Sequence, residues 1–157
     1  MTTDYKVAEV ELSYKNRVPY KERKKVQTSL DAYNLLINNH DDDTIDYKET
    51  FKVLYLNQAS QVVGCFTLSQ GGITSTCVDV RNILQGALLT NAVAMVLAHN
   101  HPSGLAVPTG ADITVTKRIG TALQAVEVQL VDHIVVAEDD FVSMVQSGYR
   151  FDDYLLP

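Results

Sequence analysis

The sequence predicts a single α/β domain in which helices flank one mixed β-sheet. A chain of 157 residues, 46% of them apolar, suits one domain with a sizeable core. Residues 92–98 are apolar at every position, which is typical of a strand buried on both faces of a sheet. Stretches with the periodicity of helices alternate with strand-like stretches along the chain, and this order favours a sheet with helices on its faces.

The first 45 residues are expected to form a strand and a helix that pack on the main domain as an extension. Residues 7–14 alternate apolar and polar side chains, which is the period of a half-buried strand. Residues 28–39 begin with Thr and Ser and continue with the apolar spacing of an amphipathic helix. The acidic stretch that follows is expected to be a loop before the main domain, residues 46–157.

The main domain is expected to begin with a hairpin of strands 51–57 and 61–69, because two strand-like runs flank a short turn-like segment. An irregular crossover follows over residues 71–80. The remaining elements come in chain order: a helix over 81–91, the buried strand 92–98, a helix over 109–125, and strands over 127–137 and 141–145.

Charge and composition exclude several classes of function. The net charge is -6, and residues 26–157 carry six Lys and Arg against fifteen Asp and Glu, so a nucleic-acid partner is disfavoured. Residues 92–98 are too few to cross a bilayer, and the polar N-terminus lacks a signal peptide's apolar segment, which predicts a cytoplasmic protein without membrane contact. Cys65 and Cys77 form no CxxC motif and are expected to be small core residues in a reducing compartment.

Two of the four histidines, His99 and His101, stand one residue apart in HNHPSG, directly after the buried strand. Side chains at i and i+2 of a strand lie on the same side, so both can face one metal ion if the chain bends toward it. Asp112, in the first turn of the next predicted helix, is the candidate third ligand. Two imidazoles and one carboxylate are typical of hydrolytic zinc sites, which leave a fourth position for water.

The same residues permit a simpler interpretation. Thr109 and Asp112 have the spacing of a helix capping box, in which the two side chains bond to the first turn of a helix. Histidines at the end of a strand can also lie on the surface or bond to buried carbonyl groups. The residues alone leave the metal site and the cap open.

The segment HNHPSGLAVPTGAD resembles the signature H-x-H-x7-S/T-x2-D of the JAMM (JAB1/MPN/Mov34) metalloproteases, and it is most similar to their bacterial RadC-like branch. The similarity covers roughly the last 110 residues. It implies an MPN/JAB fold, with the architecture of the cytidine deaminases, and one zinc ion per chain held by His99, His101 and Asp112. It also implies cleavage of a peptide or isopeptide bond by zinc-activated water.

The resemblance assigns further roles near this signature. The register of ETFKVLYLN places Glu49 where the family has its general base, although Asp43 and Asp46 are rivals nearby. Thr109 stands where the family usually has serine, whose hydroxyl helps hold the water or the developing oxyanion, and an N-cap role is the alternative. We interpret His133 as a hydrogen-bonding structural residue and not as a ligand.

The leading hypothesis is therefore a zinc metallopeptidase that acts on a peptide or protein substrate. The alternative is a catalytically weak or inactive MPN-type binding module linked to DNA repair or mobile-element processes. An HNH nuclease is the least favoured, because the three residues of that motif are spread over a long ββα segment and are not adjacent. The sequence leaves the oligomeric state open.

Overall fold

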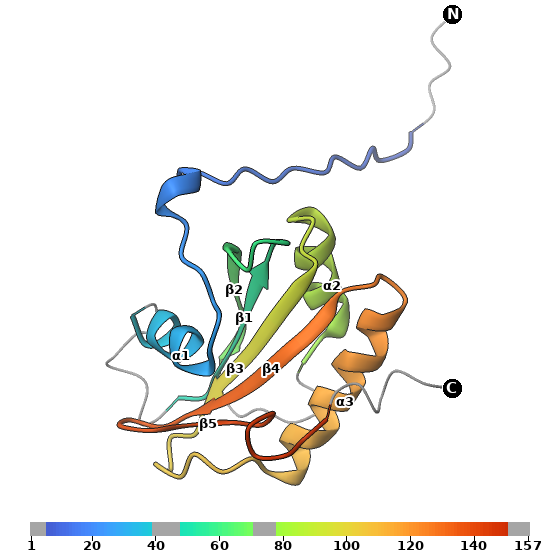
Figure 1. Cartoon of the computed structure of the whole chain (residues 1–157). Helices are drawn as coiled ribbons and strands as arrows, with labels where there is room; N and C mark the ends of the chain where they lie inside the picture. The colour runs from blue at the N-terminus through green and yellow to red at the C-terminus, as the bar shows by residue number, and fades with distance from the viewer. Residues whose placement is uncertain (1–5, 39–47, 71–77, 151–157) are drawn as a thin grey trace, which may run out of the picture.

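The computed structural model describes residues 6–38, 48–70 and 78–150. One five-stranded sheet crosses this part of the chain, with α1 on one face and α2 and α3 on the other (Figure 1). In chain order the elements are η1 (Tyr20–Glu22), α1 (Ser29–Asn38), β1 (Thr50–Leu56), β2 (Val62–Gln70), α2 (Val80–Leu89), β3 (Ala94–Asn100), α3 (Gly110–Gln124), β4 (Gln129–Val136) and β5 (Phe141–Ser143).

The sheet is mixed, as the sequence predicts. Its strand order is β2-β1-β3-β4-β5. β1 runs antiparallel to β2 and to β3, whereas β3 and β4 are parallel and are joined through α3. Parallel neighbours need such a crossover, because a tight turn can only join antiparallel strands. The fold is therefore the predicted α/β architecture with one mixed sheet.

Both faces of the central strands are buried, which explains why their sequences are apolar at every position. Phe51, Val53 and Tyr55 of β1 pack with α2 and α3. Leu54 and Leu56 pack on the opposite face, in the cluster that includes the buried side of α1. β3 divides its side chains between the two clusters in the same way. The two layers of helices hold the centre of the sheet, and the candidate site lies at one end of β3.

The close fit of α2 against β1 depends on a glycine. The hydroxyl of Tyr55 donates a hydrogen bond of 2.9 Å to the carbonyl of Ile83. A Cβ atom at Gly86, one turn further along α2, would lie 2.2 Å from the Tyr55 hydroxyl oxygen. Only a residue without a side chain leaves room for this contact.

Residues 7–14 do not form the expected strand. They are extended but pair with no other described strand, and their apolar side chains are exposed, with Val10 84% and Leu12 82% accessible. At the end of this segment, the Tyr14 hydroxyl donates a hydrogen bond to the carbonyl of Val63 on β2. Alternation marks a strand only when a neighbouring strand supplies backbone partners, and none lies beside this arm in the described ranges.

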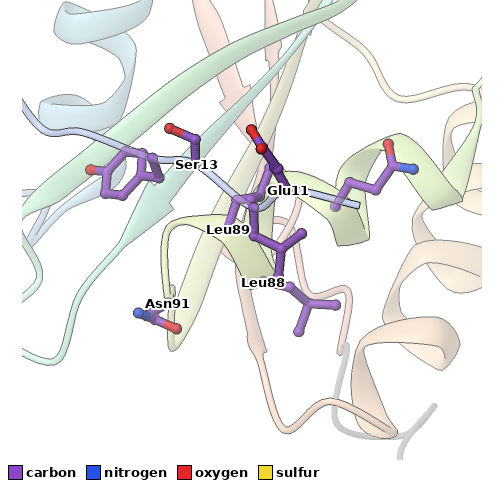
Figure 2. A pocket seen from close by; sticks show the side chains of 8 residues that line it. Glu11, Ser13, Leu88, Leu89 and Asn91 are labelled. Atoms are coloured by element: carbon purple, nitrogen blue, oxygen red, sulfur yellow. The ribbon is translucent and has the colours of Figure 1, made fainter. Parts of the chain in front are cut away.

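A pocket of about 740 Å³ lies between this N-terminal arm and α2 (Figure 2). Its lining includes Leu12, Leu88 and Leu89, together with a few polar side chains. It shares no lining residue with the predicted site. The hollow is therefore a feature of the arm and not of the candidate metal centre.

The structure corrects two further expectations. The buried strand runs over Ala94–Asn100 instead of 92–98, because the Ala92 amide bonds at 2.9 Å to the Ala87 carbonyl and so belongs to the end of α2. Cys65 is exposed and not a core residue, since it lies on the edge strand β2. Cys77 lies outside the described residues.

The expected division between residues 1–45 and 46–157 also falls outside the described residues and stays a prediction. No helix within the described ranges combines the length and the hydropathy needed to cross a membrane.

Candidate metal centre

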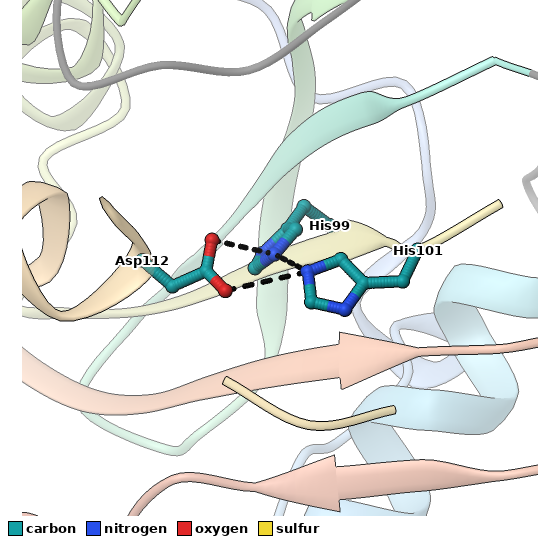
Figure 3. A group of neighbouring side chains, drawn as sticks. All are labelled: His99, His101 and Asp112. Atoms are coloured by element: carbon teal, nitrogen blue, oxygen red, sulfur yellow. Dashed lines mark hydrogen bonds and ion pairs between the residues drawn. The ribbon is translucent and has the colours of Figure 1, made fainter. Parts of the chain in front are cut away.

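The three predicted ligand side chains converge at the end of β3 (Figure 3). Nε2 of His99 lies 2.9 Å from Nε2 of His101 and 3.0 Å from Oδ1 of Asp112. Nε2 of His101 lies 3.3 Å from Oδ2 of Asp112. Among the described residues, these three form a group whose ligand atoms all lie within 4.8 Å of one another.

A tight turn after β3 brings His101 to this point. The His101 amide still bonds to the Val136 carbonyl of β4 at 2.8 Å, and the Gly104 amide then bonds back to the His101 carbonyl at 3.1 Å. Gly104 has a φ of 86°, a left-handed conformation that favours glycine. Nδ1 of His101 lies 2.9 Å from the Leu105 carbonyl, which can only accept, so this nitrogen carries the hydrogen and Nε2 faces the centre.

Asp112 is held by a capping box at the start of α3. The Thr109 amide donates to Oδ2 of Asp112 at 2.6 Å, and the Asp112 amide donates to the Thr109 hydroxyl at 3.3 Å. The same carboxylate faces both histidines, so the cap and the metal site are not exclusive interpretations. The cap orients the carboxylate that the site would use. Thr109 itself is exposed at the helix start, and its catalytic role stays a prediction.

The electrostatics of the group favour an ionised carboxylate. Burial of Asp112 opposes ionisation, but hydrogen bonds from His101 and His99 outweigh it and hold the pKa of the carboxyl well below its usual value. In turn the hydrogen bond to Asp112 raises the pKa of His101, with a smaller contribution from the charge of Glu49. The two shifts show that the group favours a positive charge beside the Asp112 carboxylate, either a proton on His101 or a metal cation in its place.

Two buried residues stand behind His99. Nε2 of His133 lies 2.8 Å from Nδ1 of His99, and the Thr116 hydroxyl lies 2.6 Å from Nδ1 of His133. The position of His133 agrees with its interpretation as a hydrogen-bonding residue. Sequence reasoning missed Thr116, although it lies one helical turn after Asp112 and therefore on the same side of α3.

Phe51 closes the apolar side of this group. Its ring stacks on His99 with a centroid separation of 6.1 Å and meets the edge of His133 at 5.6 Å. Phe51 is fully buried and pairs with His99 across the β1–β3 ladder. An apolar wall of this kind excludes water from the inner side of the histidines.

Glu49 precedes β1 and is half-buried. It lies two residues before Phe51, so the antiparallel register that pairs Phe51 with His99 places Glu49 beside the His101 end of the site. The Asn100 side chain fixes the backbone on both sides of Glu49, since it accepts from the Thr50 amide and donates to the Lys48 carbonyl, both at 2.8 Å.

Asn100 is a second residue that sequence reasoning missed, although it stands between the two histidines of the motif. The rivals of Glu49, Asp43 and Asp46, lie outside the described residues.

The donor set fits a zinc ion. A tetrahedral ion about 2.1 Å from each ligand atom requires those atoms to lie about 3.4 Å apart. The three separations at the centre are 2.9, 3.0 and 3.3 Å. Two imidazole nitrogens and one ionised carboxylate also match the chemistry that zinc prefers in hydrolytic sites.

Comparison with known proteins identifies relatives of this chain. The UPF0758 protein YfjY of Escherichia coli is 44% identical over 101 residues, which are 64% of this chain and 63% of that protein. A UPF0758 protein of Cellvibrio japonicus is 40% identical over 65% of this chain and 46% of its own length. A UPF0758 protein of Salinibacter ruber is 34% identical over 75% of this chain and 48% of its own length.

The chain thus spans between about half and two thirds of the length of these relatives. The family model of the RadC-like JAB domain matches residues 26–149, which include every helix and strand of the described sheet domain. The chain belongs to the RadC-like JAB domain family.

Proposed function

We propose that the chain is a zinc-dependent metallohydrolase that cleaves a peptide or isopeptide bond in a peptide or protein substrate in the cytoplasm. The observation that carries the proposal is the convergence of His99, His101 and Asp112, whose ligand atoms lie within 4.8 Å of one another. The family match supports the same chemistry, because a JAB domain with all three ligand positions filled keeps the donors that a metal requires.

Zinc, when bound here, supplies a Lewis acid and lowers the pKa of a water molecule to near 7. The chain's residues prepare the centre for this ion. His101 keeps its hydrogen on Nδ1, where the Leu105 carbonyl accepts it, so that Nε2 presents a lone pair. The capping box fixes the Asp112 carboxylate at the opposite side of the centre.

Glu49 is the proposed general base. It would take a proton from the attacking water and give it to the leaving amine, the two transfers that cleavage of an amide bond requires. Its support is positional: the β1–β3 register directs it to the His101 end of the site, and its charge contributes to the raised pKa of His101. Asn100 holds the peptide groups on both sides of it.

Thr109 is the proposed donor to the developing oxyanion. Its hydroxyl accepts the Asp112 amide, and this leaves the hydroxyl hydrogen available for a second partner. A hydrogen-bond donor aimed at an oxyanion lowers the barrier by a few kcal/mol in comparable sites, about 2.7–4 kcal/mol. The exposure of Thr109 is compatible with contact to a substrate.

The first test is the metal content of the untagged protein, purified without added metal and measured by plasma mass spectrometry. The parent is expected to hold about one zinc per chain, and His101→Ala is expected to lose it. Asp112→Asn is expected to lose the zinc as well. Asp31→Asn is its matched control, because Asp31 caps α1 by accepting from the Gln27 and Thr28 amides and bonds to no histidine in the part of the chain that the structure describes.

The second test is a peptide-library cleavage assay of the zinc-loaded parent beside Glu49→Gln. Cleavage by the parent alone, with equal zinc content in both proteins, supports the hydrolase. If the parent folds but takes up no zinc, or if Glu49→Gln keeps every effect of the parent, the binding-module alternative takes its place.

A further inference from the structure

A closed ring of polar contacts begins and ends at Asp112, and the three contacts on its buried side are hydrogen bonds. Its side chain faces Nε2 of His99 at 3.0 Å, and Nδ1 of His99 faces Nε2 of His133 at 2.8 Å. Nδ1 of His133 faces the Thr116 hydroxyl at 2.6 Å, and that hydroxyl reaches the backbone carbonyl of Asp112 at 2.6 Å. The ring therefore joins the carboxylate of Asp112 to its own backbone through three other side chains.

The direction of the ring, meaning which atom donates in each hydrogen bond, follows from the bond to the Asp112 carbonyl. The Asp112 carbonyl can only accept, and a hydroxyl has one hydrogen, so the Thr116 hydroxyl donates to that carbonyl. Its oxygen must then accept from Nδ1–H of His133. The neutral ring of His133 has no second hydrogen, so its Nε2 accepts from Nδ1–H of His99.

The opposite direction would leave an unfavourable contact in the buried interior. The direction argued here leaves a comparable contact only at the centre, where Nε2 of His99 faces Oδ1 of Asp112 at 3.0 Å and a proton or a cation can lie between them. If Thr116 donated to His133, two acceptor oxygens, those of Thr116 and of the Asp112 carbonyl, would lie 2.6 Å apart without a hydrogen between them. His133 would then donate to His99 and force the hydrogen of His99 onto Nε2, the nitrogen that faces the centre.

We infer that Thr116 and His133 are positioning residues that keep a hydrogen on Nδ1 of His99 and so leave its Nε2 lone pair for a metal. This inference rests on the proposed function in its last step, whereas the direction of the ring is a property of the metal-free protein. It assigns a role to two residues outside the ligand set. Neither touches the metal position in this assignment, since both act through His99.

Burial makes the ring effective. His133 is 0% exposed, Thr116 1% and His99 3%, so water does not compete for these hydrogen bonds. Nδ1 of His133 bonds to the Thr116 hydroxyl and Nε2 to His99, and a neutral imidazole satisfies both contacts. Partners of this kind behind a histidine ligand typically change metal affinity by about 10- to 100-fold when they are removed.

The two histidine ligands differ in how their hydrogens are fixed. His101 uses the backbone carbonyl of Leu105, which no substitution can remove. His99 uses side chains, which can be changed one at a time. Thr116 is the better target, because valine has nearly the same shape as threonine and lacks only the hydroxyl.

The direction is tested by nitrogen NMR of histidine-labelled, metal-free parent protein. The expected spectrum has the hydrogen of His133 on Nδ1 and a hydrogen on Nδ1 of His99. A hydrogen on Nε2 of His133 overturns the inference. This measurement needs neither zinc nor a variant, so it stands even if the proposed function fails or Thr116→Val does not fold.

The consequence is tested by zinc affinity in competition with a chromophoric chelator. Thr116→Val is expected to bind zinc about 10- to 100-fold more weakly than the parent, and Thr116→Ser within about twofold of it. Thr121→Val is the matched control, because the Thr121 hydroxyl donates to the carbonyl four residues earlier at 3.0 Å but is exposed and away from the centre. Equal affinity of Thr116→Val and the parent overturns the inference, and a parent that binds no zinc refutes the proposed function alone.

Discussion

Asn100 points away from the two histidines beside it and accepts a hydrogen bond of 2.8 Å from the backbone amide of Thr50. Neighbouring residues of a strand face opposite sides, so one short segment of β3 serves two purposes. His99 and His101 form the centre, and Asn100 ties that segment to the start of β1. The segment that carries the two proposed histidine ligands thus also fixes the position of the proposed base, Glu49.

Asn100→Ala is expected to loosen the start of β1. Thr50 is buried, and its amide and the Lys48 carbonyl would lose their partner, at a cost of about 1–3 kcal/mol in the free energy of unfolding. Hydrogen exchange of the Thr50 amide should become faster by the corresponding factor. Asn57→Ala is the control, because Asn57 also bonds to backbone amides, those of Ala59 and Gln61, but in the hairpin turn. Unchanged protection of Thr50 in Asn100→Ala would contradict this role.

Within the described residues the same capping box occurs at the start of both α1 and α3, and of these two only the box at α3 lies beside described histidines. Thr28 and Asp31 cap α1 with the spacing and bonds that Thr109 and Asp112 use at α3. Thr28→Ala and Thr109→Ala are each expected to lower the free energy of unfolding by about 1 kcal/mol. Only Thr109→Ala should also weaken zinc binding, because only its partner carboxylate faces His99 and His101. Urea unfolding measures the loss of stability in both variants, and chelator competition measures their zinc affinity. Equal zinc affinity in both would show that the α3 cap does not support the metal site.

Local patterns explain how much of this structure the sequence could predict. The run before His99 is apolar at every position because β3 packs against helices on both faces, and that pattern identified the centre of the sheet. The three converging side chains were predicted because His99 and His101 share one side of a strand and Asp112 opens the next helix. These relations lie within 14 residues of chain, where spacing alone restricts the geometry.

The remaining features depend on partners far away in the sequence. Residues 7–14 alternate like a strand, but no neighbouring strand pairs with them. His133 reaches His99 only because the parallel pairing of β3 and β4 places it opposite Leu97, and it reaches Thr116 only because α3 packs against β4. Asn100 reaches Thr50 only through the pairing of β1 with β3. A single sequence gives the period of each element but not the register between elements.

Gly86→Ala is expected to destabilise the fold without touching the centre. The new Cβ atom would lie 2.2 Å from the Tyr55 hydroxyl oxygen, so α2 or the buried ring must shift, at a cost of about 1–3 kcal/mol. Gly120→Ala in α3 is the control, because its nearest neighbour, a Leu130 methyl, lies at 3.9 Å, and this change should stabilise by about 0.4–1 kcal/mol. Thermal unfolding of both variants measures the difference, and a neutral Gly86→Ala would show that the contact between α2 and β1 is loose.

Zinc is expected to stabilise the folded chain, because the ligands come from β3 and α3 and meet only when both are in place. A ligand that binds the folded state alone adds about 2.7 kcal/mol at 100 times its Kd, which for a chain of this size raises Tm by roughly 5–10 °C. Excess zinc should raise the Tm of the metal-free parent, and EDTA should reverse the shift. His101→Ala lacks one ligand and should show little shift, whereas Asp31→Asn should respond like the parent because the α1 cap lies outside the metal group. An equal rise in the Tm of His101→Ala and of the parent would mean that zinc binds elsewhere on the chain. The zinc found in the purified protein could then not be assigned to this centre.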